Sequence, residues 1–384
     1  MKRFLVAVLA MASLPLAAQS LDDLNIQIHG YATQGMVYTT NNNWNSMETS
    51  EGSPAWTEVV FNVTAQPDPK LRVGAQMRYF IMGNFGNQIT LDWASGDYKE
   101  NEKLGLRFGK VKTPNGLMND IQDIDPAFLW SLLPQSAYPI TSRTSILAHY
   151  GVVAYGNLRL GQKAGKLEYQ LYAGERVLPS NDGFFVPIIE SGAEYPNGLS
   201  GPTSGGTLRW HMPVDGLMAG VAWDREDLTG EVEIPAAGFV GNNIDAPFKI
   251  PFFFGKYEHN KVMVGAEYSR VPADHKSVFT TGPSGVQHNV IDNREWYGMA
   301  SYKLTGKLTG GTYFSSLINR KAALSPARYQ KDWALSGRYD FSQFLYLKAE
   351  QHWMDGTNMG YLTVDNTNVK TTTRMTIFKI GVDF

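Results

Sequence analysis

One stretch of the chain decides the fold: Leu71-Arg72-Val73-Gly74-Ala75-Gln76-Met77-Arg78-Tyr79. Its odd-numbered residues are apolar, and its even-numbered residues are polar or glycine. Because successive side chains of a β-strand point to opposite faces, this pattern predicts a strand with one apolar face and one wet face. The same alternation recurs along the chain, in residues 57–63, 104–108, 158–160, 167–173, 208–212, 333–341, 345–349 and 376–384.

The segments between these strands alternate between short and long. The short ones are residues 66–70, 100–103, 161–166, 213–216, 258–261, 305–307 and 341–344, and all but the last contain Pro, Gly, Asp or Asn residues, which favour turns. The longer, polar ones are residues 41–55, 113–146, 179–204, 231–249, 273–290, 321–330 and 355–369, with a tighter loop near 83–87. Seven turns and eight loops predict about sixteen antiparallel strands. A strand with one lipid face needs closure into a transmembrane β-barrel, and short turns opposite longer loops are typical of such barrels.

Composition supports an exported β-protein and excludes several other classes. The chain has 384 residues, of which 18% are charged, whereas about 25% is usual for soluble domains. It contains no Cys, so disulfides, thiolate chemistry and cysteine-based zinc sites are excluded. A formal net charge of −2 gives no indication of nucleic-acid binding.

The first twenty residues predict a cleaved signal peptide. Lys2 and Arg3 precede an apolar run over residues 4–12, and small residues follow the break at Pro15. We expect cleavage after Ser20, with cleavage after Ala18 as the alternative. Residues 21–384 then form one barrel, exported through the periplasm. No other apolar stretch reaches the roughly 18 residues that a spanning helix requires.

The end of the chain supports an outer-membrane location. Residues 378–384 alternate apolar and polar side chains and finish at Phe384. They resemble the carboxy-terminal signature of bacterial outer-membrane proteins, which implies insertion into the cell outer membrane, in contact with lipid and lipopolysaccharide.

The third loop is residues 113–146, when the tighter loop near 83–87 is counted as the second. It is the most informative segment. Loops this long are usually functional or disordered, and its Leu, Phe and Trp side chains need packing partners. We expect it to fold inward and narrow the lumen, as the third loop does in the sixteen-stranded porins that the chain resembles. Residues 109–120 and 132–138 resemble, more narrowly, Gram-negative porins loosely akin to the phosphate-selective porins.

The porin resemblance implies passive, water-filled diffusion of small polar or charged solutes and ions through a homotrimer. In general porins, acidic residues of the third loop face a wall of basic residues, and that transverse field filters charge. The expected constriction residues are the acidic Asp120, Asp123 and Asp125, and the basic Arg72, Arg78, Arg107, Lys110, Arg159, Arg209 and Arg338.

Other functions remain open from the sequence. A substrate-specific channel for anions or for aromatic and organic acids is the first alternative, since Phe128, Trp130 and Tyr138 could form an apolar track. A secreted adhesin and a barrel enzyme are less favoured. The chain has no Gly-x-Ser-x-Gly or His-Glu-x-x-His motif, and its seven histidines are scattered. We therefore expect no enzymatic activity, no cofactor, no metal and no nucleic-acid partner.

Overall fold

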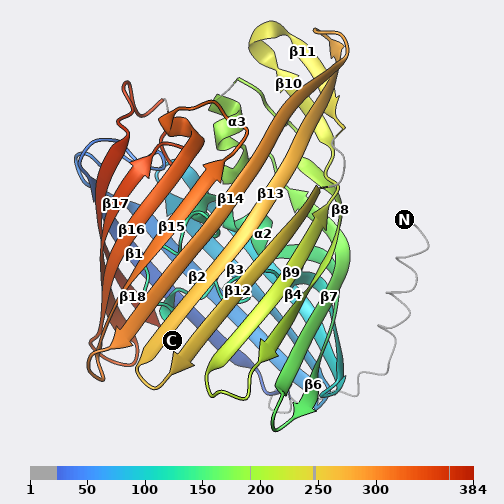
Figure 1. The fold of residues 1–384 in the computed structure, drawn as a ribbon, viewed down its shortest axis with the longest axis vertical. Coiled ribbons are helices and arrows are strands. Elements are labelled where there is room, and N and C mark those ends of the chain that lie inside the picture. Colours follow the sequence, from blue (N-terminus) through green and yellow to red (C-terminus); the bar gives the residue numbers. More distant parts are fainter. Residues whose placement is uncertain (1–23, 191, 245–247, 363) are drawn as a thin grey trace.

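The computed structural model describes residues 24–190, 192–244, 248–362 and 364–384, and their strands form a closed barrel (Figure 1). The predicted signal peptide, residues 1–20, lies outside the described residues. Sixteen strands of the described chain build the wall: β1 Gln27–Thr39, β2 Ser53–Asp68, β3 Leu71–Met82, β4 Phe85–Asn101, β5 Leu104–Lys112, β6 Ala148–Gly161, β7 Gly165–Leu178, β8 Leu199–His211, β9 Leu217–Glu226, β12 Phe248–His259, β13 Val262–Thr281, β14 Val286–Lys303, β15 Leu308–Asn319, β16 Tyr329–Asp340, β17 Leu345–Gly356 and β18 Thr372–Asp383.

Every wall strand pairs antiparallel with its neighbour, and the last strand closes the ring on the first. Tyr31 of β1 stands opposite Asp383 of β18. Leu217 of β9 stands opposite Tyr257 of β12, so the wall continues directly between these two strands. Closure leaves no edge strand in the wall, which satisfies the wall's backbone without help from water. The predicted strand number, antiparallel order and all seven short turns are confirmed.

The predicted alternation separates an apolar outer face from a polar inner face. In β3, Met77 points outward and is 47% exposed, whereas Gln76 and Arg78 are buried inside the barrel. In β18, Phe378 is 52% exposed while the adjacent Lys379 is 1% exposed. Apolar residues are thus exposed on the outer face and charged residues are buried inside, which is the opposite of the usual arrangement in a soluble protein. This arrangement is typical of a barrel that faces lipid.

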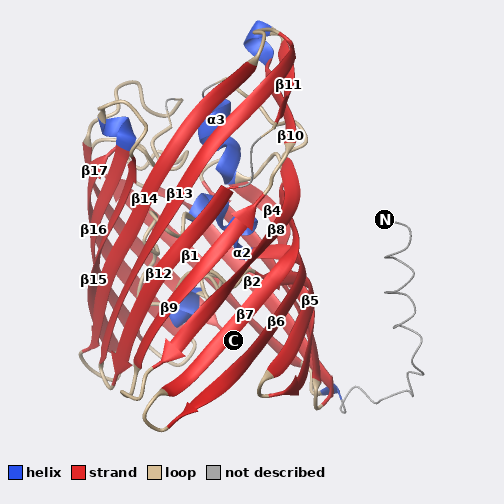
Figure 2. Ribbon diagram, turned by 45° about the vertical axis from the view of Figure 1, so that its right-hand side comes forward, coloured by secondary structure: helices blue, strands red, loops and turns tan. Residues whose placement is uncertain are grey.

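Two predicted loops contain strands instead. Residues 273–290 form the end of a long hairpin, because β13 and β14 stay paired up to Val278 and Val286. Residues 231–249 contain a second hairpin, β10 Gly230–Ile234 and β11 Phe239–Asn243 with η5 Pro235–Ala237 between them, and β11 pairs with the end of β13. Figure 2 shows both hairpins standing above the barrel rim. Above the rim both faces of a strand are wet, so its sequence loses the alternation that signals a strand.

The remaining helical turns lie at the loop end or inside the barrel. They are η2 Asp125–Ala127, η3 Ile140–Ser142, α2 Arg143–Leu147, η4 Gly183–Phe185, α3 Val186–Glu190 and η6 Pro326–Arg328. In the part of the chain that the structure describes, no helix is long and apolar enough to cross a membrane.

Loops at the loop end cover part of the interior. Trp44 and Met47, from the segment between β1 and β2, share one buried cluster with Tyr361, from the segment between β17 and β18. Leu132 from the third loop belongs to the same cluster. These connections therefore pack onto the third loop from above.

Candidate functional site: the loop inside the barrel

Loop 3, defined here as residues 113–147, leaves the wall early and lies against its inner face. It follows β5, which has nine residues, the shortest of the sixteen wall strands described. The loop begins below the rim because β5 ends there, and Figure 1 shows α2 within the barrel. Hydrogen bonds join loop 3 to strands on opposite sides of the wall, among them β1 through Tyr31 and β13 through Glu267.

One side of loop 3 is apolar and packs on one half of the wall. Leu117, Met118, Phe128, Leu129, Trp130 and Tyr138 form a buried cluster with inward residues of β9 and of β12 to β16. The rings of Trp130 and Tyr313 meet edge to face, with centroids 5.4 Å apart. This packing explains why a polar-lined barrel contains so many aromatic residues on this loop, since burial of each ring contributes favourable free energy.

Two buried carboxylates of the wall hold the loop backbone. Glu267 on β13 accepts hydrogen bonds from the Leu117 amide at 3.0 Å and from the Tyr138 hydroxyl at 2.6 Å. Glu350 on β17 accepts from the amides of Ser131 and Leu132, at 2.7 and 3.1 Å. Hydrogen bonds to charged acceptors are stronger than hydrogen bonds between neutral groups. These contacts therefore hold the loop backbone in place against the wall.

Asp125 is anchored by two lysines from neighbouring strands. Its carboxylate accepts from Lys348 Nζ of β17 at 2.9 Å, from Lys379 of β18, and from the Tyr346 hydroxyl at 2.7 Å. Burial by itself raises the pKa of Asp125, but the two ammonium groups outweigh burial and hold that pKa well below its ordinary value. Asp125 is therefore a charged structural anchor and not a free carboxylate facing the pore.

The depressed pKa of Asp125 makes a signed prediction for pH dependence. Unfolded aspartate titrates near pH 4, so the anchor contributes its full stability above about pH 4 and loses it as pH falls through the folded pKa. We expect the difference in unfolding free energy between wild type and Asp125→Ala to be fully present at about pH 5 and to become smaller as the pH falls below about pH 4. Urea unfolding of the reconstituted barrel over a pH series measures this. A difference that already shrinks near pH 6 would contradict the assignment.

Asp120 and Asp123 also make direct ion pairs. Asp120 lies 2.7 Å from Arg209 of β8. Asp123 lies 2.7 Å from Lys112 and accepts from Gln76 at 2.8 Å. All three loop carboxylates predicted from the sequence are thus paired by direct contact, and Asp120 also lines a cavity on the turn side of the loop.

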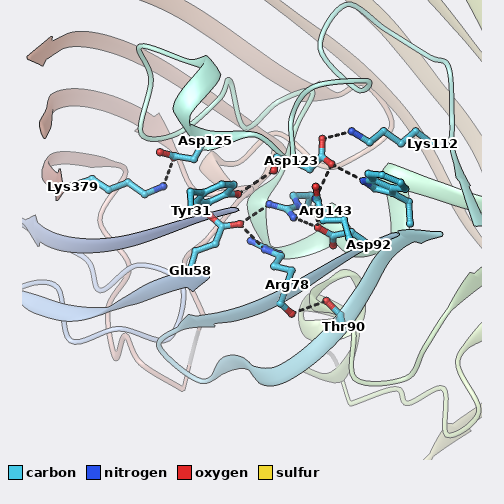
Figure 3. Close-up of polar contacts among 12 residues, drawn as sticks. Tyr31, Glu58, Arg78, Thr90, Asp92, Lys112, Asp123, Asp125, Arg143 and Lys379 are labelled. Carbon is cyan, nitrogen blue, oxygen red and sulfur yellow. Dashed lines mark hydrogen bonds and ion pairs between the residues drawn. The ribbon is translucent and has the colours of Figure 1, made fainter. Parts of the chain in front are cut away.

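A buried network of alternating charge lies beside these carboxylates (Figure 3). Arg78 of β3 and Arg143 of α2 both contact Glu58 of β2, at 2.7 and 2.6 Å. Arg143 also pairs with Asp92 of β4. Arg143, Glu58, Lys112 and Lys379 were not among the residues predicted from the sequence. Strand alternation could have predicted that Glu58 and Lys379 point into the barrel. No pattern in the sequence predicts which residues they contact there.

The predicted basic residues separate into three groups. Arg78, Arg209 and Arg338 contact loop 3 or the network beside it, Arg338 by donating to the Phe128 carbonyl at 2.9 Å. Arg72 and Arg107 line an open cavity on the turn side, where Arg107 pairs with Asp97 at 2.9 Å.

Lys110 and Arg159 do not join the loop carboxylates, which corrects the prediction. Lys110 stands opposite Tyr150, which points outward, and its Nζ lies over the Tyr150 ring at 5.6 Å. Arg159 lies next to the β6–β7 turn and pairs with Glu102 at 3.0 Å, with a side chain 78% exposed. Lys110 has the same parity as the outward residues Leu104, Leu106 and Phe108. Arg159 has the opposite parity to the outward Leu158 and Leu160, but parity does not say how far along the barrel a residue lies, and its position beside the turn removes it from the site.

Two large cavities lie on the turn side of loop 3. One cavity of about 530 Å³ is lined by Arg72, Arg107 and Asp120, and another of about 330 Å³ by Ile121, Trp130 and Lys303. Two cavities of about 40 Å³ each lie by Arg143 and by Trp44. Loop 3 and the loops packed on it therefore occupy much of the interior.

Comparison with solved structures places this architecture in a known fold class. The chain superposes on OmpF of Salmonella typhi with a TM-score of 0.59, 14% identity, and 95% and 99% of the two chains covered. The anion-selective porin from Comamonas acidovorans superposes with a TM-score of 0.56 and 10% identity, over 94% of this chain and 99% of the porin. The trimer form of OmpT, an outer membrane protein of Vibrio cholerae, superposes with a TM-score of 0.56 and 14% identity, over 94% of this chain and 99% of OmpT. The chain has the porin fold. No family model and no curated protein matches the sequence.

Within this porin fold, the inward histidines contact fixed partners. His352 lies 3.0 Å from Asp332 and 3.1 Å from Glu350, and all three are buried behind loop 3. His149 contacts the Thr113 hydroxyl at 3.0 Å, and His211 lies 3.4 Å from Glu168. Among the described residues, no group of three or more His, Asp or Glu side chains is placed to hold a metal ion.

Proposed function

We propose that the chain is an outer-membrane porin that lets small polar or charged solutes and ions diffuse passively through a water-filled lumen. The observation that carries this proposal is the closed sixteen-strand wall, apolar outside and charged inside, with loop 3 bound across its interior. The porin fold of much of the chain supports it. Export by the signal peptide of residues 1–20 and insertion into the cell outer membrane, with lipid and lipopolysaccharide around the barrel, belong to the same proposal.

In this proposal loop 3 narrows the route and does not move during transport. Its carboxylates and backbone amides are held by buried charges from β8, β13, β17 and β18. Breaking such buried pairs is costly. Solutes therefore pass along a fixed constriction, driven by their own concentration gradient.

The charge filter differs from the one that the sequence suggested. Direct ion pairs bury Asp123 and Asp125, so the groups that act on a passing ion are those that line the larger turn-side cavity. That cavity is lined by Arg72, Arg107, Lys112 and Arg209 and by Asp97, Asp120 and Glu168. Arg72 donates to the Thr64 hydroxyl at 3.3 Å and leaves most of its charge directed at the cavity. We propose a weak preference for anions at this point.

Replacing Arg72 with alanine is expected to shift selectivity towards cations. Removing one exposed charge changes local ion energies by about 0.2–1 kcal/mol, so the cation-to-anion permeability ratio should rise roughly twofold. The reversal potential under a salt gradient measures this ratio. Arg159→Ala is the matched control, because it removes the same charge at the turn rim, beside Glu102. Equal shifts in the two variants would remove Arg72 from the filter.

Planar-bilayer recording of the mature protein tests the function itself. We expect large, steady conductance steps, and steps in groups of three would support the homotrimer that we also propose. The Vibrio cholerae structure in trimer form is consistent with that assembly. Absence of conductance from correctly folded barrels would mean that loop 3 closes the lumen.

Two further parts of the sequence prediction stay as proposals. A relation to the phosphate-selective porins rests on residues 109–120 and 132–138. The absence of enzymatic activity, cofactors and nucleic-acid partners is our expectation too. For enzymatic activity, this expectation is supported by the complete burial of His352 behind loop 3.

A further inference from the structure

The smaller turn-side cavity, of about 330 Å³, has one apolar side and one basic rim. Loop 3 supplies the apolar side through Leu117, Ile121, Phe128, Leu129 and Trp130, and β13 adds Met263. Ile121 is 39% exposed, although it lies within the barrel. An apolar surface left open beside a water-filled route is unfavourable unless something covers it.

The rim of the same cavity carries more positive than negative charge. Four cations line it, Lys256, Lys261, Lys303 and Arg338, with two carboxylates, Glu258 and Asp340. Lys256 pairs with Glu258, and Arg338 pairs with Asp340, each at 2.8 Å. The charges of Lys261 and Lys303 therefore exceed what the two carboxylates balance.

We propose that this cavity binds small organic anions with an apolar body, of which aromatic monocarboxylates are the simplest. The ring packs on Ile121 and the aromatic residues of loop 3, and the carboxylate lies at the rim between Lys261 and Lys303. Ligand sites are typically apolar cavities of about 300–1,000 Å³ with a few placed polar groups, as here. This inference rests on the proposed function and names a solute class that the pore would select.

The larger turn-side cavity differs in its lining, and this difference assigns the organic-anion site to the smaller cavity. Its lining is dominated by paired charges, with four cations and three carboxylates around about 530 Å³. Such a surface suits water and simple ions. Loop 3 thus separates a polar cavity from an amphipathic one, with Ile124 lining the first and Ile121 lining the second.

Equilibrium dialysis of the reconstituted full barrel against benzoate, benzamide and acetate tests the proposal. Benzoate has both the ring and the charge, benzamide lacks the charge, and acetate lacks the ring. We expect saturable binding of benzoate and weaker binding of the other two. The same benzoate is expected to block single-channel current when added from the turn side.

Two variants separate the rim from the apolar side. The double variant Lys261→Gln/Lys303→Gln should weaken benzoate about fivefold, as expected for two partly exposed charges, and leave benzamide unchanged. Ile121→Asn should weaken benzoate and benzamide alike. The matched control is Lys163→Gln, which removes an exposed lysine from the β6–β7 turn.

The possible results are distinct. Equal benzoate binding in the double variant and wild type, or equal affinity for benzoate and acetate, would overturn the site. Benzoate binding that persists in a barrel without conductance would keep the site and reject the pore. Conductance with no saturable benzoate binding would keep the pore and reject the site.

Discussion

Asp125→Ala is expected to lower the free energy of unfolding by about 3–5 kcal/mol, the usual cost of removing one partner from a buried ion pair. The variant leaves Lys348 and Lys379 buried without their shared carboxylate. We expect loop 3 to leave the wall near η2, which should also make single-channel conductance larger and noisier. Urea unfolding of the reconstituted barrel, followed by gel mobility, measures the stability.

A triple variant separates two causes of destabilisation: the loss of the Asp125 contacts, and the cost of leaving buried lysine charges without a partner. Asp125→Leu/Lys348→Met/Lys379→Met removes all three charges, and apolar replacement of a buried charged triad is often neutral or stabilising. We expect it to recover at least about half of the loss. Recovery is incomplete because Lys348 also donates to the Trp130 carbonyl at 3.0 Å. Asp215→Ala, at an 89% exposed side chain, is the control. Equal destabilisation by the single and triple variants would refute the anchor.

Glu350→Ala is expected to release the middle of loop 3. The substitution orphans the amides of Ser131 and Leu132 and the Ser336 hydroxyl, which donates to Glu350 at 2.7 Å. Each buried donor left without a partner costs about 1–3 kcal/mol, so we expect a total loss of at least about 3 kcal/mol. Because the natural chain contains no Cys, a Ser131→Cys reporter gives a single thiol whose labelling rate measures exposure of the loop.

Glu350→Gln is the graded comparison for this test. Glutamine keeps one acceptor oxygen but presents an amide nitrogen where a second donor points, so labelling should be intermediate between wild type and Glu350→Ala. Glu48→Ala, at an exposed residue of the β1–β2 loop, should leave the rate unchanged. Slow labelling in Glu350→Ala, equal to wild type, would show that apolar packing alone holds loop 3.

Prediction from the sequence succeeded where structure is local. Alternation in residues 71–79 identifies both faces of β3, and Pro, Gly, Asp or Asn mark six of the seven short turns. It failed above the barrel rim, where residues 273–290 remain a hairpin with both faces wet. Alternation of apolar and polar residues arises because the two faces of a strand differ in burial. Where both faces are exposed to water, the alternation is lost.

Prediction of the candidate site was weaker, because its partners are far apart along the chain. The loop carboxylates were identifiable as a cluster, but Asp125 meets lysines more than two hundred residues away. Arg143, within loop 3 itself, joins Glu58 and Asp92 from two strands. Their proximity depends on how the loop folds back, which no local pattern encodes.

The amino-acid sequence by itself determined the barrel, its strand number, its inner and outer faces, and the loop rich in apolar residues. Each of these follows from alternation and turn chemistry, which act between residues close in the chain. Only the tertiary structure decided that Asp120, Asp123 and Asp125 are paired and that Lys110 and Arg159 lie outside the site. It also decided that loop 3 separates a polar cavity from an amphipathic one. Ion pairing depends on distances of a few ångströms between side chains of different strands, and those distances exist only once the wall has closed around the loop.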